Sequence, residues 1–387
     1  MPVADWVDPR LLRSDPYPIY ARLRQEAPVA AVPAINKVLL TSFAGCVYAE
    51  QHPEVFSSVV EGANLNRALG GVSLIRKNDP EHATERAAVN PTLRPSQVTQ
   101  VWSDRFRRNT EQALDVLAAA GDRADLNRDF ARPLAAKNLM DLVGIRDVPV
   151  ETFARWSADF IAGAGNVLDD AEIWARCTSS RVEAESAVDT SLAYLQRHPD
   201  ESMISLFVAA GMPVESIRAN ILLTISGGVN EPQHMITAMV YLLSQHPERR
   251  PASLDAGAWR RVFDEAVRLY TPIAMVTRQT VRDVVLEGAA IPAGSQIGIM
   301  LASANRDPAV YDAPDDFEPD RTERRHLGFG AGTHLCAGKW VAEASVAGIG
   351  VPMLYERFPA IRPDPIGDVH WEGFAFRGIT RFPARLA

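Results

Sequence analysis

Apolar residues recur at helical spacing along much of the chain, and one such segment is far longer than the others. It runs from Val214 to Ser244, which at 1.5 Å per residue predicts a helix about 45 Å long. Near the N-terminus, prolines followed by a helical pattern predict another helix. The shorter predicted helices cover 16–26, 97–120, 260–269 and the segment from Ala337 onward. Helix therefore dominates the expected fold.

Strand patterns are few and short. Val38 to Thr41 predicts one strand, and β-like runs between Val284 and Met300 flank an Ile-Pro-Ala-Gly turn. The stretch 57–80 lacks periodicity and contains several glycines, so we expect a long loop of the kind that often serves function. No change of composition marks a linker. The expected architecture is a single domain over residues 1–387, mainly α with small β-sheets.

Composition narrows the class of protein. Among the 387 residues, 47% are hydrophobic and 23% charged, which is typical of a soluble globular protein. No stretch approaches the roughly 18 consecutive apolar residues of a membrane span, and the acidic start of the chain does not read as a signal peptide. The net charge of -8 argues against general nucleic-acid binding. Three cysteines (Cys46, Cys177, Cys336) indicate a reducing, cytoplasmic setting rather than a disulfide framework.

The segment from His326 to Ala342 contains the clearest chemical signal. Cys336 follows a loop with three alternate glycines and stands where a helical pattern begins. Glycines allow a tight loop beneath a flat group, and amide groups at a helix start lower the pKa of a thiol, so we expect a metal-binding thiolate. Such a thiolate suits a haem iron. A buried, inert cysteine and a Cys336–His334 nucleophile pair are the alternatives.

 The ten-residue pattern Phe-Gly-x-Gly-x-His-x-Cys-x-Gly is less ambiguous than the cysteine alone. It spans residues 329–338 and fixes six positions in ten. The chain here resembles the cytochrome P-450 family, whose fold holds a haem between a long central helix and the cysteine loop. The resemblance implies haem b (iron protoporphyrin IX) as cofactor, Cys336 as the iron ligand and Phe329 as part of the cofactor-binding loop. The family usually ends the motif with Leu-Ala, and this chain has Val341-Ala342.

Further motifs follow in the family's order. Glu265 and Arg268 share a helix face at i,i+3, and Phe317–Arg321 matches the segment that completes the family's buried network, with Arg321 as its cation. A solvated surface pair is the alternative. By the same resemblance the haem propionates are held by four side chains. These are His82, Arg86, Arg278 and His334.

The long helix departs from the family at the point that crosses the haem. The family's acid–alcohol pair is replaced by Asn230 and Glu231, followed by Pro232, and Gly227 and Gly228 precede them. We expect the glycines to leave room for a ligand and Pro232 to kink the helix. Glu231, with Asn230 and Gly228, is expected to form the catalytic group that delivers protons during oxygen activation. The alternative is that Glu231 caps a broken helical turn.

The Gly-Gly-x-Asn-Glu-Pro-x-His pattern resembles bacterial cytochromes P-450 that O-demethylate guaiacol- and syringol-type methoxyphenols. The implied partners are a small aromatic substrate, O2 and a separate ferredoxin or flavin/iron–sulfur reductase, with no nucleic acid or membrane. A basic patch for docking of this redox partner is expected at Arg105, Arg107, Arg108 and Lys339. The alternative is that these charges form a solvated face. Alternatives are a terpenoid or polyketide hydroxylase and a non-catalytic haem protein. The expected substrate-lining residues are Leu69, Val72, Leu74, Phe160, Ile225, Val229, Ile273, Val276, Phe374 and Phe376.

Overall fold

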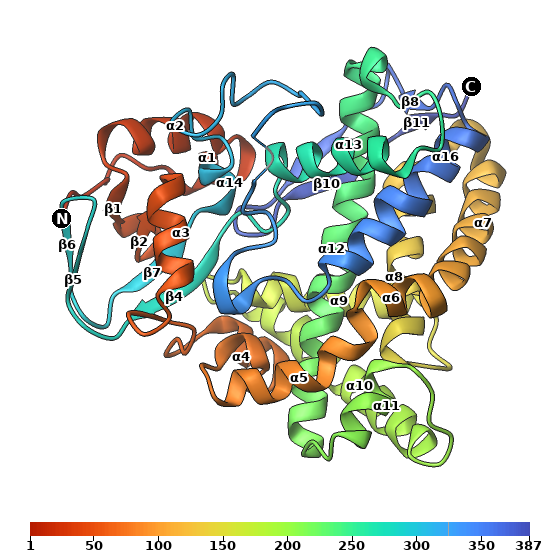
Figure 1. Ribbon diagram of the computed structural model, residues 1–387, viewed down its shortest axis with the longest axis horizontal. Helices are drawn as coiled ribbons and strands as arrows, with labels where there is room; N and C mark the ends of the chain where they lie inside the picture. The colour runs from red at the N-terminus through yellow and green to blue at the C-terminus, as the bar shows by residue number, and fades with distance from the viewer. Residues whose placement is uncertain (324) are drawn as a thin grey trace.

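A long helix, α12 (Val214–Gln245), passes through the helical part of the protein in the computed structural model, which describes residues 1–323 and 325–387 (Figure 1). It packs against α8 and α9 on one side and α13 on another. Apolar residues lie all round its middle, which is why it is buried there. The helices are α1 Pro9–Ser14, α2 Tyr17–Glu26, α3 Phe43–Gln51, α4 Asn64–Leu69, α5 Glu81–Leu93, α6 Pro95–Gln97, α7 Ser103–Ala120, α8 Arg132–Val143, α9 Val150–Ala164, α10 Ala171–Leu195, α11 Met203–Ala209, α13 Ala256–Leu269, α14 Leu301–Ala304, α15 Lys339–Ala342 and α16 Val351–Arg357.

The five-stranded sheet and the β5–β6 pair lie beside the N-terminal helices, at the opposite side of the molecule from α7, whereas β8 and β11 lie next to α16 (Figure 1). One sheet has five strands in the order β1-β2-β7-β4-β3, in which only β2 and β7 run parallel. Three two-stranded sheets pair β9 with β10, β8 with β11 and β5 with β6. The strands are β1 Val29–Val32, β2 Lys37–Leu40, β3 Phe56–Ser57, β4 Val276–Thr280, β5 Val284–Leu286, β6 Ala289–Ile291, β7 Gln296–Ile299, β8 Arg362–Pro363, β9 His370–Glu372, β10 Gly378–Arg381 and β11 Ala384–Arg385.

The predicted mainly α fold with small sheets is confirmed, and the long helix matches its predicted bounds within a residue at each end. The predicted loop 57–80 is wrong in part, because it contains α4 and a 3-10 turn, η2 (Leu74–Arg76). Helix α4 is only six residues long, too short to show a period in the sequence. It ends at Gly70, which has φ 68° and so takes the left-handed conformation that glycine accepts without strain.

Two predicted helices are more irregular than their patterns suggest. The segment 97–120 begins with the π-helical turn Val98–Trp102 before α7 starts. The helix after the cysteine loop likewise consists of α15, a π-helical stretch Glu343–Gly350 (η8) and α16. A π-turn inserts one residue into the helical repeat, and a sequence period cannot reveal that. None of the described helices is long and apolar enough to cross a membrane.

Candidate functional site

The cysteine loop lies between α3 and α13 and leads into α15. The backbone N–H of Cys336 donates to the carbonyl oxygen of Phe329 at 2.9 Å, which closes the loop on itself. The Phe329 ring packs against Phe263 of α13, with centroids 6.2 Å apart. The amides of Gly338 and Lys339, at the start of α15, donate toward the Cys336 sulfur. The loop therefore holds the thiol at a helix start, as predicted from the sequence.

The loop glycines serve close packing against the protein itself. A Cβ at Gly328 would lie 2.2 Å from Cγ1 of Val267, and one at Gly332 would lie 2.4 Å from the carbonyl oxygen of Glu50. Gly332 also has φ +63°, a conformation that residues with a Cβ rarely adopt. The expectation that these glycines make room beneath a flat group needs correction, because at both positions the space is filled by α13 or α3.

The pKa of Cys336 is raised, whereas a lowered pKa was expected. Burial is the main cause, since it disfavours the thiolate, and the nearby Glu231 carboxylate adds to it. Amides at 338 and 339 and the Arg86 guanidinium act in the opposite direction but do not outweigh burial. The residue as a whole keeps accessible surface, although protein atoms surround its thiol. A metal ion bound there would shift the balance to the thiolate.

Glu231 lies on α12 close enough to Cys336 for the two groups to interact electrostatically. Its Oε2 is shut off from solvent and has no hydrogen-bond partner, and Asn230 Nδ2 donates to Oε1 at 3.5 Å, the outer limit of a hydrogen bond. Burial raises the pKa of Glu231 to about 8. A carboxylic acid with that pKa can hold and release a proton near neutral pH.

The two glycines before Glu231 face different neighbours. A Cβ at Gly227 would lie 3.5 Å from Oε2 of Glu231, an ordinary contact. A Cβ at Gly228 would lie 2.7 Å from Cδ1 of Leu139 on α8. The expectation that Gly228 leaves room for a ligand is therefore wrong in this structure, because that side of α12 is packed against α8. Helix α12 also continues through Pro232, so there is no broken turn for Glu231 to cap.

The side chains predicted to hold propionates cluster around the cysteine loop. His82 and His334 stack with ring centroids 4.2 Å apart, and Arg86 Nη2 donates to the carbonyl oxygen of Leu335 at 2.6 Å. Nε2 of His334 is engaged by Ser58 Oγ at 2.8 Å, whereas Nε2 of His82 is shut off from solvent and has no partner. Nδ1 of His82 lies 3.1 Å from Asp79 Oδ1, so a ring that carries both protons would have Nε2 free to donate to an acidic ligand group.

Arg278 and Arg76 complete this positive environment, and the sequence interpretation missed Arg76. Arg278 Nη2 donates to Glu50 Oε1 at 2.9 Å in an almost fully buried ion pair. Arg76 Nη1 donates to the carbonyl oxygen of Thr277 at 2.9 Å, while its Nε has no partner. The unpartnered nitrogens of His82 and Arg76, together with Arg86, fit a group that carries two carboxylates beside a thiolate-bound iron, as haem b does.

The Glu-x-x-Arg pair is buried, so the alternative of a solvated surface pair is wrong. Arg268 donates through Nε and Nη2 to the two oxygens of Glu265, at 2.8 and 2.7 Å. Arg268 Nη1 also donates to the carbonyl oxygen of Asn305, and Arg321 lies 3.3 Å from Glu265 Oε1. The three charged groups join α13 to the segment just before the cysteine loop, as the family resemblance implied.

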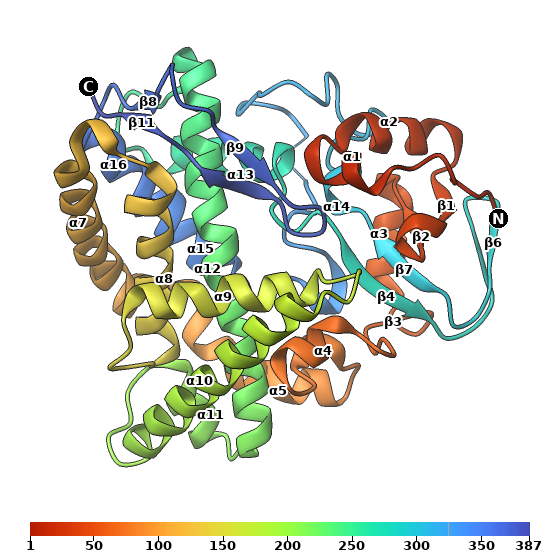
Figure 2. The same ribbon diagram turned by 180° about the vertical axis from the view of Figure 1, so that it is seen from behind.

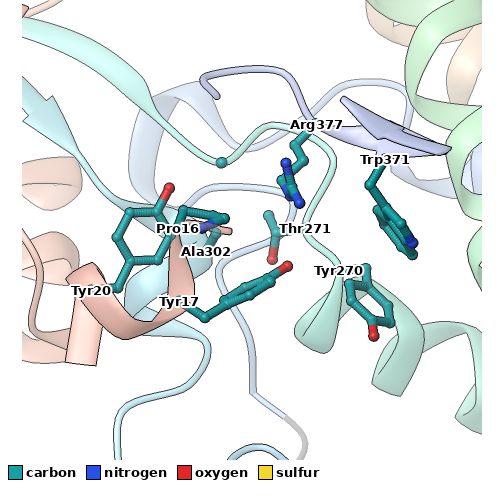
Figure 3. A pocket seen from close by; sticks show the side chains of 9 residues that line it. Pro16, Tyr17, Tyr20, Tyr270, Thr271, Ala302, Trp371 and Arg377 are labelled. Carbon is teal, nitrogen blue, oxygen red and sulfur yellow. The ribbon is translucent and has the colours of Figure 1, made fainter. Parts of the chain in front are cut away.

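Two segments predicted to line the substrate lie side by side. Ile273 bridges to Phe376, and the N–H of Ala274 donates to the carbonyl oxygen of Ala375 at 2.9 Å. Arg377 fixes this turn to the N-terminal segment, because its Nη2 donates to the carbonyl oxygen of Ser14 at 2.7 Å. Strand β9 lies beside α1 (Figure 2). The hollow around Arg377 that Figure 3 shows has no space for a water molecule, so it serves packing rather than binding.

The other predicted lining residues differ in how deeply they are buried. Leu69, Phe160, Ile225 and Val229 are almost fully buried in one hydrophobic cluster that spans α4, α9 and α12. Leu74 packs against that cluster, and Val72 is 48% exposed. Val276 and Phe374 are half-buried. Their contact with a substrate stays a prediction.

Of the four residues of the predicted docking patch, some already interact with other side chains of the protein. Arg105 lies 3.8 Å from a Glu201 carboxylate oxygen and over the Trp102 ring, so its charge is partly engaged. Arg107 and Arg108 are exposed on α7. Lys339 lies over the rings of Phe329 and Trp340 beside the cysteine loop. A docking role for these residues stays a prediction.

Comparisons with known proteins agree with this site. Residues 259–354 match the family model described as cytochrome P-450. Mycinamicin IV hydroxylase/epoxidase of Micromonospora griseorubida is 29% identical over 327 residues, which cover 80% of this chain and 79% of that protein. Steroid C26-monooxygenase of Mycolicibacterium smegmatis is 26% identical, over 83% of this chain and 80% of that protein. The solved structure of CYP109E1 from Bacillus megaterium with testosterone has a TM-score of 0.83 at 23% identity, covering 96% of this chain and 97% of that one.

Proposed function

We propose that the chain is a haem-b-dependent monooxygenase of the cytochrome P-450 family and that it O-demethylates small methoxyphenols of the guaiacol or syringol type. The observation that carries the proposal is Glu231, a buried acid on α12 that faces Cys336 where the family has an alcohol. When bound, haem supplies the oxidising chemistry, and the protein supplies its ligand, orientation and protons.

The proposed ligand is the Cys336 thiolate, held by amides at 338 and 339. Of the four side chains that the resemblance implied for the propionates, His82, Arg86 and His334 remain proposed partners, whereas Arg278 is paired with Glu50. Glu231 is proposed to bring protons to dioxygen, because its free Oε2 has a pKa near physiological pH and no competing partner. Asn230 orients that carboxyl group through its contact with Oε1.

The overall reaction balances as a monooxygenation. An aryl methyl ether, O2, two electrons and two protons give a hydroxymethyl ether and water, and the hydroxymethyl ether then divides into a phenol and formaldehyde. Glu231 is proposed to deliver the protons. The electrons come from a separate ferredoxin or flavin/iron–sulfur reductase, which we place near Lys339 because it lies beside the cysteine loop.

The apolar character of the proposed lining supports a small neutral aromatic substrate. All ten residues have hydrocarbon side chains, and three of them, Phe160, Phe374 and Phe376, are aromatic. Such walls favour flat apolar rings and offer no charge to an ionised substrate. The bridge between Ile273 and Phe376 fixes two parts of this wall relative to one another.

Hydroxylation of a larger apolar compound is the second candidate function. It is favoured by the names of two relatives, which hydroxylate or epoxidise mycinamicin IV and oxidise a steroid. A spectral titration separates the two functions. Guaiacol and syringol are expected to displace iron-bound water and shift the spin state, and formaldehyde should then form in turnover. A spin shift with terpenoids, macrolides or steroids alone would assign the second function.

The proton-delivery role has its own test. Glu231→Gln keeps the size of the side chain but cannot titrate, so we expect less product for each electron consumed, with substrate affinity unchanged. An unchanged ratio of product to electrons would remove the role. Because hydrogen peroxide carries both oxygen atoms and both electrons, we also expect peroxide-driven demethylation by the wild type. No product with peroxide would contradict that expectation.

A further inference from the structure

Arg76 carries a positive charge into the protein without an acidic partner. It ends the η2 turn, in the segment between α4 and α5, and one of its amino groups, Nη1, is used by Thr277. Within residues 1–323 and 325–387, the charged groups coupled to it are cations, Arg278 and Lys37, of which Arg278 acts on its pKa. Burial, and to a smaller degree that repulsion, lowers the pKa of Arg76 to about 10, so it stays charged at neutral pH.

The neighbouring cation is already neutralised. Arg278 Nη2 donates to Glu50 Oε1 at 2.9 Å, and the two side chains are 6% and 2% exposed. The other oxygen, Oε2, accepts the N–H of Ala331 at 2.9 Å, so Glu50 is committed to Arg278 and to the cysteine loop. One uncompensated positive charge therefore remains at Arg76. A half-buried cation without a counter-charge is unfavourable, which calls for an anionic ligand.

The free edge of Arg76 has the shape that suits a carboxylate. With Nη1 bonded to Thr277, the edge formed by Nε and Nη2 remains. Arginine uses this edge elsewhere in the chain, since Arg218 holds both oxygens of Asp189 through Nε and Nη2, at 2.8 Å each. A planar guanidinium matches a carboxylate in a two-pronged pair, which is stronger than a single hydrogen bond.

We propose that Arg76 binds a carboxylate through its Nε–Nη2 edge, beside the Thr277–Arg278 backbone of β4. The carboxylate belongs either to the edge of the bound haem or to an acidic substrate. Charge balance favours the haem edge, because haem b has two carboxylates, and among the described cations around the cysteine loop Arg76 and Arg86 have no acidic partner. Glu50 and Arg76 would then act together, because Glu50 neutralises the charge of Arg278 and Arg76 binds the carboxylate in its place.

The first experiment measures haem retention in the holoenzyme rather than turnover. Arg76→Met is compared with the wild type and with Arg94→Met, which makes the same change at an exposed position. We expect Arg76→Met to release haem to an apomyoglobin acceptor about 10- to 100-fold faster, the effect of a lost charged hydrogen bond, and Arg94→Met to match the wild type. Should Arg76→Met fail to fold, Arg76→Lys retains the charge and is expected to give a smaller increase.

Two further comparisons identify the carboxylate. If it belongs to haem, reconstitution with the dimethyl ester of haem abolishes the difference between wild type and Arg76→Met. If it belongs to a substrate, haem retention is unchanged, and a spectral titration with 4-methoxybenzoate is weakened at least tenfold while guaiacol binds as before. Either result supports the carboxylate site.

Other outcomes overturn the proposal. Unchanged haem release together with unchanged benzoate and guaiacol binding excludes a carboxylate at Arg76. Equally faster release of natural and esterified haem shows that Arg76 acts only by packing. Glu50→Gln tests the charge balance, because in the Arg76→Met background it frees Arg278 and is expected to restore part of the haem retention. A double variant that releases haem as fast as Arg76→Met contradicts that balance.

Discussion

His234 of α12 lies directly against Gly378 of β10, so closely that a Cβ at position 378 would sit 2.0 Å from the imidazole ring. Nδ1 of the same histidine contacts the carbonyl oxygen of Ile379 at 3.2 Å. The ring is buried, and burial lowers the pKa of His234 to about 4, so it is neutral at pH 7. This contact sets how closely β10 approaches the helix that carries Glu231.

Replacing Gly378 by alanine should therefore force β10 away from α12. We expect Gly378→Ala to lower the free energy of unfolding by about 1–3 kcal/mol, the usual effect of overpacking a core. Denaturant unfolding measures it. Gly348→Ala is the control, because a Cβ there meets nothing closer than 3.7 Å and helical glycine-to-alanine changes are usually stabilising. Equal effects at the two positions would contradict a specific contact with His234.

The neighbouring glycines 227 and 228 should respond differently to the same substitution. Gly228→Ala pushes against Leu139 and is expected to destabilise the protein by about 1–3 kcal/mol. Gly227→Ala makes only an ordinary contact with Glu231, so stability should be kept while the yield of product per electron falls. Unfolding curves and coupling measurements on both variants test this. A loss of stability in Gly227→Ala alone would reverse the assignment of the two faces.

Removing the charge of Glu265 should be among the most damaging single changes. Arg268 and Arg321 would lose a buried counter-charge, and we expect Glu265→Gln to cost about 3–5 kcal/mol of unfolding free energy and to reduce haem content. Denaturant unfolding and the haem absorbance of purified protein report the two effects. Glu26→Gln, which removes half of an exposed i,i+4 pair with Arg22, should stay within about 0.5 kcal/mol of the wild type.

Glu231 should give the protein a distinct pH dependence. Its pKa is raised from 4.5 to about 8 in the folded protein, so the folded state holds a proton that the unfolded chain releases. The stability contributed by the neutral carboxyl is complete below pH 4.5 and is lost as the pH rises through 8. Between pH 5 and about 9, the free energy of unfolding of the wild type should fall steadily relative to that of Glu231→Gln. Parallel pH profiles would place Glu231 in water.

The elements with a long, regular pattern were predictable, and those that depend on a partner were not. The 32-residue helix α12 and the ten-residue cysteine motif each carry enough positions to be recognised alone. Helix α4 has only six residues and is fixed by contact with α9. Whether the space beside Gly228 is open or filled likewise depends on α8, and the sequence of α12 alone does not indicate it.

Charge at the site was the least predictable property. Cys336 was expected to have a lowered pKa from its place at a helix start, but burial and Glu231 outweigh those amides. Arg76 lies in a stretch without periodicity, where an arginine usually indicates a solvated surface. Only its position next to Arg278 and away from any carboxylate distinguishes it. Both effects arise from groups far apart in sequence, which composition and spacing do not bring together.

The anchoring of Arg377 also has a consequence for the newly made chain. Its guanidinium binds the carbonyl oxygens of Arg13 and Ser14, across 364 and 363 positions of sequence. At translation rates of about 5–20 residues per second, the first helix leaves the ribosome roughly 20–70 seconds before Arg377 is made. The turn with Phe374 and Phe376 can therefore form its hydrogen bonds to the N-terminal segment only after synthesis is nearly complete. Until then the carbonyl groups of Arg13 and Ser14 lack these donors.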